Sequence, residues 1–158
     1  NSYDYKIYNE WLDENVFSFG FFGKVANSLS GKNIKLSDRL YLPSSKLRGF
    51  ESGKVGPKDG ADYIGGNYAA SINIASSLSQ ILPNSQNTNF SIFFDAANVW
   101  GIDYSSSLSD ESKIRSSIGI ALDLFTPIGP LNFTLSEPIT KGKNDITESF
   151  RFNLGTTF

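Results

Sequence analysis

The sequence contains no cysteine and no histidine among its 158 residues. Without cysteine, the chain cannot form a disulfide, bind a metal through thiolates or supply a cysteine nucleophile. Without histidine, it lacks the commonest metal ligand and the commonest general base. We therefore expect a protein that is not an enzyme, with no catalytic residue, no metal site and no cofactor.

A large charge and a long apolar run are missing as well. The formal net charge is -2, so the electrostatics do not favour nucleic acid as a partner. No run of about eighteen apolar residues is present, which argues against transmembrane helices. A transmembrane β-barrel remains compatible, because every second residue of a barrel strand faces the lumen and can be polar. Residue 1 opens onto a strand-like segment without a secretory leader, so we expect a fragment or a processed piece.

The last eleven residues, 148–158, show an alternation of apolar and polar side chains. Apolar residues occupy one face of this segment, namely Phe150, Phe152, Leu154 and Phe158. The opposite face carries Ser149, Arg151, Asn153, Gly155 and Thr157. A tilted strand needs about 9–11 residues to cross the hydrocarbon layer of a bilayer. The segment therefore predicts a membrane strand that closes a barrel.

Six further segments show the same period of two, whereas helix signals are poor. They cover residues 3–12, 16–26, 64–74, 90–96, 116–124 and 131–135. Long connections at residues 30–63, 101–113 and 139–147 alternate with shorter ones. Outer-membrane barrels show this alternation between long extracellular loops and short periplasmic turns. The sequence thus predicts an all-β, antiparallel transmembrane barrel with a periplasmic C-terminus.

A soluble β-sandwich is an alternative, since it too is built from short alternating strands. Against it, one face of each segment is nearly pure Phe, Ile and Leu, while the other carries Ser, Asn, Gly, Asp and Arg. Such polarity suits a water-filled lumen. An odd number of strands with two unpaired edges would be very unfavourable in lipid. We therefore expect the seven strands to be part of a larger barrel.

Several motifs, in order, resemble the BamA family of outer-membrane protein assembly factors, and the resemblance covers nearly the whole chain. The motifs are Leu47-Arg48-Gly49-Phe50 with Val55-Gly56-Pro57, Gly65-Gly66-Asn67, Phe93 to Trp100, Arg115 with Gly119 to Leu122, Pro127 to Leu131 with Glu137-Pro138, and Phe150 to Phe158. The resemblance implies the last seven strands of a sixteen-stranded barrel, an even number as in other bacterial barrels. It also implies that residues 30–63 form a long extracellular loop folded into the lumen.

The resemblance implies a function in folding and inserting β-barrel proteins into the bacterial outer membrane. The expected partners are the lipid bilayer, unfolded β-barrel substrates and accessory assembly lipoproteins, and the expected upstream parts are a signal peptide, POTRA repeats and nine more strands. Two-partner secretion transporters and passive porin-type barrels share parts of this architecture. Both remain alternatives at this point.

Arg48 is the residue that the resemblance marks most strongly, as a tether between the loop and the inner wall. Asp95 shares its face with Ser91 and Phe93, so it should point inward and can receive a forked guanidinium. The family often has a second acidic partner, but counting from Gly65 places Ala75 there. We expect Gly49 to allow a positive φ or a close approach to the wall, and Phe50 to be an apolar anchor.

The resemblance implies a weakly paired seam between the first and last strands of the barrel. The predicted seam and terminal signal consist of Phe150, Phe152, Leu154, Gly155 and Phe158. We expect Gly155 to weaken the strand from within, because glycine supplies no side chain for packing. An opened seam exposes unpaired N–H and C=O groups onto which an incoming strand can add. The alternative is an ordinary closing strand.

Overall fold

The computed structural model describes residues 1–12, 15–28, 31–81, 87–103, 108 and 112–155. Seven strands form one antiparallel sheet in the order β1-β2-β5-β6-β7-β8-β9. Their bounds are β1 Ser2–Leu12, β2 Asn15–Val25, β5 Tyr68–Ser77, β6 Thr88–Trp100, β7 Arg115–Thr126, β8 Gly129–Thr140 and β9 Phe150–Leu154. Two further strands, β3 Lys58–Asp59 and β4 Asp62–Tyr63, pair as a small hairpin.

Helical structure in the described residues is limited to two short 3-10 turns, η1 Leu36–Asp38 and η2 Ser79–Ile81. No helix in these residues is long and apolar enough to cross a membrane. The antiparallel, nearly all-β architecture predicted from the alternating pattern is confirmed.

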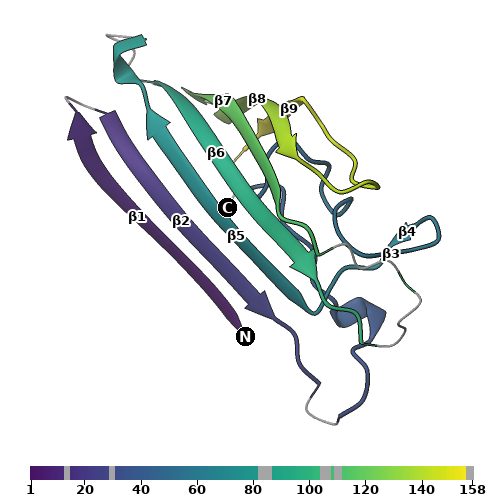
Figure 1. Cartoon of the computed structure of the whole chain (residues 1–158). Helices are drawn as coiled ribbons and strands as arrows, with labels where there is room; N and C mark the ends of the chain where they lie inside the picture. Colours follow the sequence, from purple (N-terminus) through teal and green to yellow (C-terminus); the bar gives the residue numbers. More distant parts are fainter. Residues whose placement is uncertain (13–14, 29–30, 82–86, 104–107, 109–111, 156–158) are drawn as a thin grey trace.

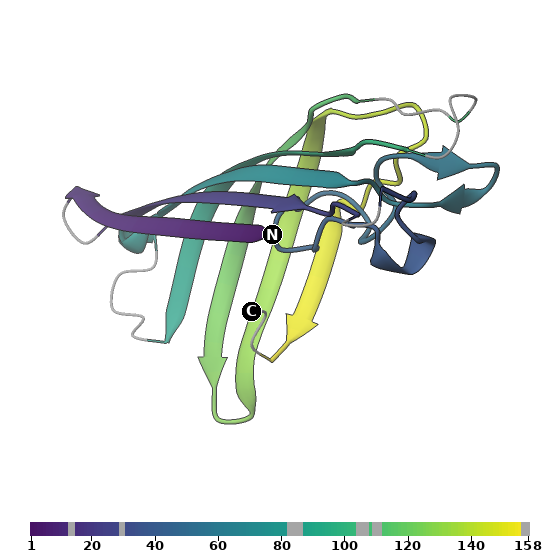
Figure 2. The ribbon, with the colours of Figure 1, turned by 90° about the horizontal axis from the view of Figure 1, so that it is seen from below.

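The large sheet is curved and open. Figures 1 and 2 show β1, β2, β5 and β6 side by side in one broad surface, from which β7, β8 and β9 turn away to form a trough. Among the described residues, β1 pairs with β2 alone and β9 with β8 alone, so these two strands are the free edges. The barrel is therefore not closed within this chain.

Side chains on the two faces of the sheet differ as the sequence predicts. On the convex face, Ile92 is 45% exposed, and Ile118 and Phe150 are each 52% exposed. On the concave face, Asp95 and Ser117 are both 0% exposed. A soluble sandwich would bury the Phe and Ile faces together in a dry core, so that alternative is wrong. An apolar outer surface of this extent is suited to contact with lipid.

Long connections gather at one end of the sheet and short ones at the other. Residues 26–67 join β2 to β5, residues 101–114 join β6 to β7, and residues 141–149 join β8 to β9. At the opposite end, β7 and β8 are joined through a turn at residues 127–128. The alternation predicted from the sequence is thus confirmed.

The strand bounds differ from the prediction at several places. β5 begins at Tyr68 rather than at residue 64, because Gly65 has a φ of +67° and Gly66 pairs with Leu40 of the preceding loop. β6 and β8 extend beyond the predicted residues 90–96 and 131–135. Alternation of apolar and polar side chains detects the middle of a strand better than its ends, where the loop residues supply other contacts.

The terminal strand is shorter than predicted. β9 covers Phe150–Leu154, whereas the prediction was residues 148–158. Gly155 follows the strand with a φ of +100°, outside the extended region, although its N–H still donates to the Pro130 carbonyl of β8 at 2.8 Å. Gly155 thus lies one residue beyond the strand bounds while it still pairs with β8 through its N–H. Phe158 lies outside the described residues.

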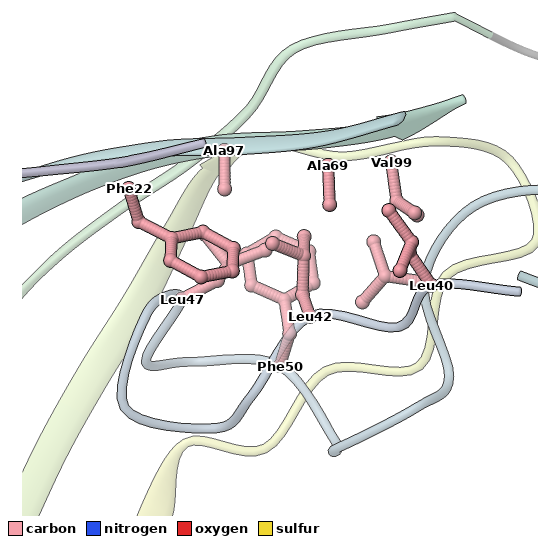
Figure 3. Packing of buried hydrophobic residues seen from close by; sticks show 9 residues of the cluster. Phe22, Leu40, Leu42, Leu47, Phe50, Ala69, Ala97 and Val99 are labelled. Atoms are coloured by element: carbon pink, nitrogen blue, oxygen red, sulfur yellow. The ribbon is translucent and has the colours of Figure 1, made fainter. Parts of the chain in front are cut away.

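The connection from β2 to β5, residues 26–67, is called the inner loop below, and its part from Leu40 to Pro57 lies against the concave face. Its apolar residues pack onto small and aromatic side chains of the sheet (Figure 3). The cluster comprises Leu40, Leu42, Leu47, Phe50 and Val55 from the loop, and Phe22, Ala69, Ala97 and Val99 from the sheet. Burial of a side chain such as Leu or Phe is worth about 1.5–3 kcal/mol. This cluster therefore holds a long loop in one position.

Candidate functional site

The best-defined polar contact between the inner loop and the sheet joins Arg48 to Asp95 of β6. The Arg48 guanidinium donates through Nε to Asp95 Oδ2 at 2.8 Å and through Nη2 to Oδ1 at 2.8 Å. The Arg48 backbone N–H donates to Oδ2 at 3.0 Å. The carboxylate thus receives a forked pair from the side chain and a third bond from the backbone, which fixes both the loop and its arginine.

Asn73 of β5 completes this contact. Asn73 is the direct cross-strand neighbour of Asp95. Its Nδ2 donates to Asp95 Oδ1 at 2.8 Å and to the Lys46 carbonyl at 2.9 Å. Ala75, where the family pattern suggested a second acid, lies two residues further along the same face. The alternating pattern alone does not identify Asn73 as a partner of Asp95, because a cross-strand neighbour follows from the strand register.

The aromatic ring of Phe93 on β6 packs against the Arg48 guanidinium. The Arg48 Cζ lies 3.5 Å from the centroid of the Phe93 ring, within the range of a cation–π contact. The ring itself rests over Gly119 of β7, where a Cβ atom would lie 2.5 Å from the Phe93 Cζ. Gly119 therefore leaves the space that the Phe93 ring occupies next to Arg48.

Gly49 meets both expectations drawn for it. Its φ is +88°, a backbone conformation that residues other than glycine rarely adopt. A Cβ atom at this position would lie 3.1 Å from the Ser117 Cβ and 3.3 Å from the Ser136 Cβ. The Ser117 hydroxyl donates to the Arg48 carbonyl. The turn and the close approach together bring the loop into contact with β7 and β8.

Phe50 is buried, as expected for an apolar anchor, at 1% exposure. Its ring belongs to the cluster shown in Figure 3. Its backbone forms an isolated bridge with Thr147, in the connection between β8 and β9. Residues 48–50 thus contact β6, β7 and the approach to β9 within a single turn of chain.

A second ion pair, between Arg115 of β7 and Asp145, was not anticipated. The two side chains are 1% and 2% exposed, and Arg115 Nε lies 2.8 Å from Asp145 Oδ2. Arg115 Nη1 also donates to Asn98 Oδ1 at 2.6 Å, and the Gly56 N–H donates to Asp145 Oδ1 at 3.4 Å. The pair joins β7, the inner loop and the β8–β9 connection. No alternating pattern marks Asp145, which lies between strands.

A third pair, Arg39 with Asp103, attaches the start of the inner loop to the β6–β7 connection. The Ile34 N–H donates to Asp103 Oδ2 at 2.9 Å. Burial alone would raise the pKa of Asp103, but hydrogen bonds from Ile34, Arg39 and Asn67 and the charge of Arg39 hold that pKa below its ordinary value. The folded state therefore favours the ionised carboxylate.

Beneath the inner loop lies a cavity of about 550 Å³ with a mixed polar lining. Cationic groups are prominent in that lining, including Lys6, Lys46, Arg48 and Arg151. Among the described residues, no group of acidic side chains is placed to hold a metal ion. The lining is compatible with a wet interior.

The predicted seam residues lie on the terminal strand with their apolar side chains outward. Phe150, Phe152 and Leu154 are all exposed on the convex face, and Phe152 packs against Phe133 of β8 with ring centroids 5.0 Å apart. β9 pairs with β8 from Leu135↔Phe150 to Leu131↔Leu154. No other strand of the described chain covers its second edge.

Comparison with known proteins shows which family shares this sequence and architecture. The Omp85 superfamily domain matches residues 2–158. The outer membrane protein assembly factor BamA of Neisseria meningitidis serogroup B is 30% identical over 141 residues, covering 71% of this chain and 17% of that protein. The sorting assembly machinery 50 kDa subunit of Saccharomyces cerevisiae is 34% identical over 165 residues, covering 94% of this chain and 33% of that protein.

A solved structure agrees with the sequence comparisons. BamA from Haemophilus ducreyi lacking POTRA domains 1–3 matches with a TM-score of 0.85 at 27% identity, covering 96% of this chain and 33% of that chain. The chain thus spans a third or less of the length of these relatives. With its nearly full-length domain match, its open antiparallel sheet and its inward-folded loop, the chain belongs to the Omp85 superfamily and is a BamA-family protein.

Proposed function

We propose that this chain forms the C-terminal part of a barrel that folds and inserts other β-barrel proteins into the bacterial outer membrane. The observation that carries the proposal is the inner loop held against an apolar-out, polar-in sheet by Arg48 and Asp95. The family membership supports the same activity, since relatives are named as assembly factors or as a sorting assembly subunit. The proposed partners are the lipid bilayer, unfolded β-barrel proteins and accessory assembly lipoproteins.

The terminal strand supplies the mechanism in this proposal. Within the described residues β9 pairs with β8 alone, and in this proposal its second edge meets the first strand of the full barrel at the seam. When the seam opens, the backbone N–H and C=O groups of this edge become available for pairing. An incoming strand that adds to this edge satisfies its own backbone groups before it reaches the hydrocarbon layer. Its apolar side chains then move into lipid, which is favourable without any external energy source. Neither a nucleotide nor a cofactor is required.

The inner loop has a structural part in the same mechanism. Its apolar cluster and its ion pairs fix the curvature of β5 to β8 from the inside. Strands β5 to β8, stabilised in this way, keep their curvature while the seam beside β9 opens. We expect Arg48→Ala to loosen the loop and to lower assembly activity.

The experiment is a seam lock in the full-length protein reconstituted into liposomes. One cysteine is placed on β9 and one on the strand that faces it across the seam, and the folding of an unfolded β-barrel substrate is followed by its resistance to SDS. Because this chain has no cysteine of its own, the introduced pair is free of competing thiols here. The oxidised variant should lose activity and regain it on reduction.

A matched lock within the sheet serves as the control. Phe94 of β6 and Ile118 of β7 are direct cross-strand partners, so a cysteine pair there links two strands that need not separate. Oxidation of this pair should leave activity unchanged. Full activity with the seam oxidised would refute the seam mechanism. Vesicles that only release solute or pass a soluble polypeptide would indicate a porin or a secretion transporter instead.

A further inference from the structure

The segment that leads into the terminal strand, residues 145–149, pairs with the inner loop instead of continuing along β8. The Glu51 N–H donates to the Ile146 carbonyl at 2.9 Å, and the Ile146 N–H donates to the Lys54 carbonyl at 3.1 Å. The Glu148 N–H donates to the Gly49 carbonyl at 3.0 Å. These residues, called the lead-in segment here, therefore form a short ladder with the loop.

β8 and β9 separate at the point where this ladder begins. Their register ends at Leu135↔Phe150, and one more backbone bond joins the Ser136 N–H to the Ser149 carbonyl at 2.9 Å. β8 itself continues to Thr140. The N-terminal end of β9 thus receives backbone hydrogen bonds both from its neighbouring strand β8 and, through the lead-in segment, from the inner loop.

Arg151 of β9 adds a side-chain contact to the same junction. Its side chain points to the concave face, and its Nη2 donates to the Phe50 carbonyl at 2.8 Å. Its Nε donates to Glu148 Oε2 at 2.9 Å, so the guanidinium bridges the loop and the lead-in segment. Phe50 lies two residues after Arg48, whose guanidinium binds β6. Residues 48–50 are therefore hydrogen-bonded to β6 through Arg48 and to β9 through the Phe50 carbonyl.

We propose that Arg151, oriented by Glu148, is a positioning residue that couples docking of the inner loop to the order of the terminal strand. When the loop leaves, Arg151 loses the Phe50 carbonyl and the lead-in segment loses its ladder. Among the described residues, β9 then keeps its short register with β8, and its N-terminal end loses the contacts that order it. Thermodynamic linkage requires the converse, so that release of β9 also weakens the loop. This inference rests on the proposed function, in which β9 borders the seam.

The test uses the full-length protein in lipid nanodiscs and measures two distant sites. Hydrogen exchange reports on the amides of Phe150–Leu154, and limited proteolysis reports on the inner loop. Arg48→Ala, which alters a contact to β6, should speed exchange in β9 roughly tenfold, equal to about 1.4 kcal/mol of opening free energy. Arg151→Gln should make the loop cleave faster. The double variant should show much less than the sum of the two effects, since both break one coupled unit.

Conservative and control variants separate coupling from general weakening. Arg151→Lys keeps the charge but cannot bind the Phe50 carbonyl and Glu148 Oε2 in the same forked geometry. Its effect on loop cleavage should therefore lie between those of the wild type and Arg151→Gln. Asn153→Ala removes the next inward side chain of β9, whose bond to Asn132 Oδ1 is long at 3.5 Å. This variant should leave the loop protected. If Arg48→Ala fails to fold, Arg48→Lys breaks the fork to Asp95 and takes its place.

Two results would overturn the coupling. One is a loop opened by the Arg48 variant while exchange in β9 stays at the wild-type rate. The other is an Arg151→Gln loop as resistant to protease as that of Asn153→Ala. Substrate folding by the wild-type protein is measured in parallel. Its absence would refute the proposed function, whereas the exchange results would still decide the coupling.

Discussion

Replacement of Gly119 by alanine is the sharpest test of how the inner loop is held. A Cβ atom at this position of β7 would lie 2.5 Å from the Phe93 Cζ and 2.2 Å from the Leu135 carbonyl oxygen of β8. Neither contact is tolerable, and the second is to backbone. The Phe93 ring must tilt, and β7 and β8 must also move apart. Because the Arg48 guanidinium lies 3.5 Å from that ring, its position changes as well.

The magnitude follows from two separate losses. Overpacking a well-packed site costs about 1–3 kcal/mol. Loss of a largely desolvated cation–π contact costs about 0.5–2 kcal/mol. We therefore expect a destabilisation of about 2–4 kcal/mol, which appears both as a lower Tm of the full-length protein and as faster proteolysis of the inner loop.

Gly20 of β2 is a matched control, since it too is a strand glycine on the inward face. A Cβ atom there would have its nearest contact at 3.6 Å, with the Asn73 Cβ, which is ordinary van der Waals contact. Gly20→Ala should be neutral or slightly stabilising, because alanine restricts the unfolded chain. Adding Phe93→Leu to Gly119→Ala should restore the Tm in part but leave the loop sensitive to protease. A Gly119→Ala protein with wild-type Tm and loop protection would refute the reasoning.

Three other perturbations have expected outcomes. Asp145→Asn removes the carboxylate that pairs with the buried Arg115, so unfolding by denaturant should show a loss of about 3–5 kcal/mol; a loss below about 1 kcal/mol, as for an exposed pair, would contradict this expectation. Gly49→Ala forces a side chain into a φ of +88° against Ser117, and should raise loop proteolysis without changing the strand content seen by circular dichroism. The folded state lowers the pKa of Asp103, so its contribution to stability is present above the ordinary carboxyl pKa and is lost as the pH falls through the lower folded value. Asp103→Asn should remove this acid dependence of loop protection, and an unchanged pH profile would argue against it.

The strands and their faces were predictable because the side-chain period of an extended chain is two. That rule placed Asp95 on the inner face and Phe150, Phe152 and Leu154 on the outer face, as the structure has them. The same rule did not reveal that Gly155 has a positive φ and lies just beyond the strand bounds. It was also silent about Asn73, because a face can be assigned from one strand alone but a cross-strand partner requires the register.

What the sequence determined by itself is the chemistry available and the side of the sheet on which each strand residue lies. The lack of cysteine and histidine excluded thiolate and imidazole chemistry from the site, and alternation separated a lipid-facing surface from a polar interior. Only the tertiary structure decided which of these groups meet. Arg48 with Asp95, Arg115 with Asp145, and Arg151 with the Phe50 carbonyl are pairs separated by many residues or by a loop without regular structure. Their meeting depends on the curvature of the sheet and the path of the inner loop, which arise from packing over the whole concave face and leave no local signal in the chain.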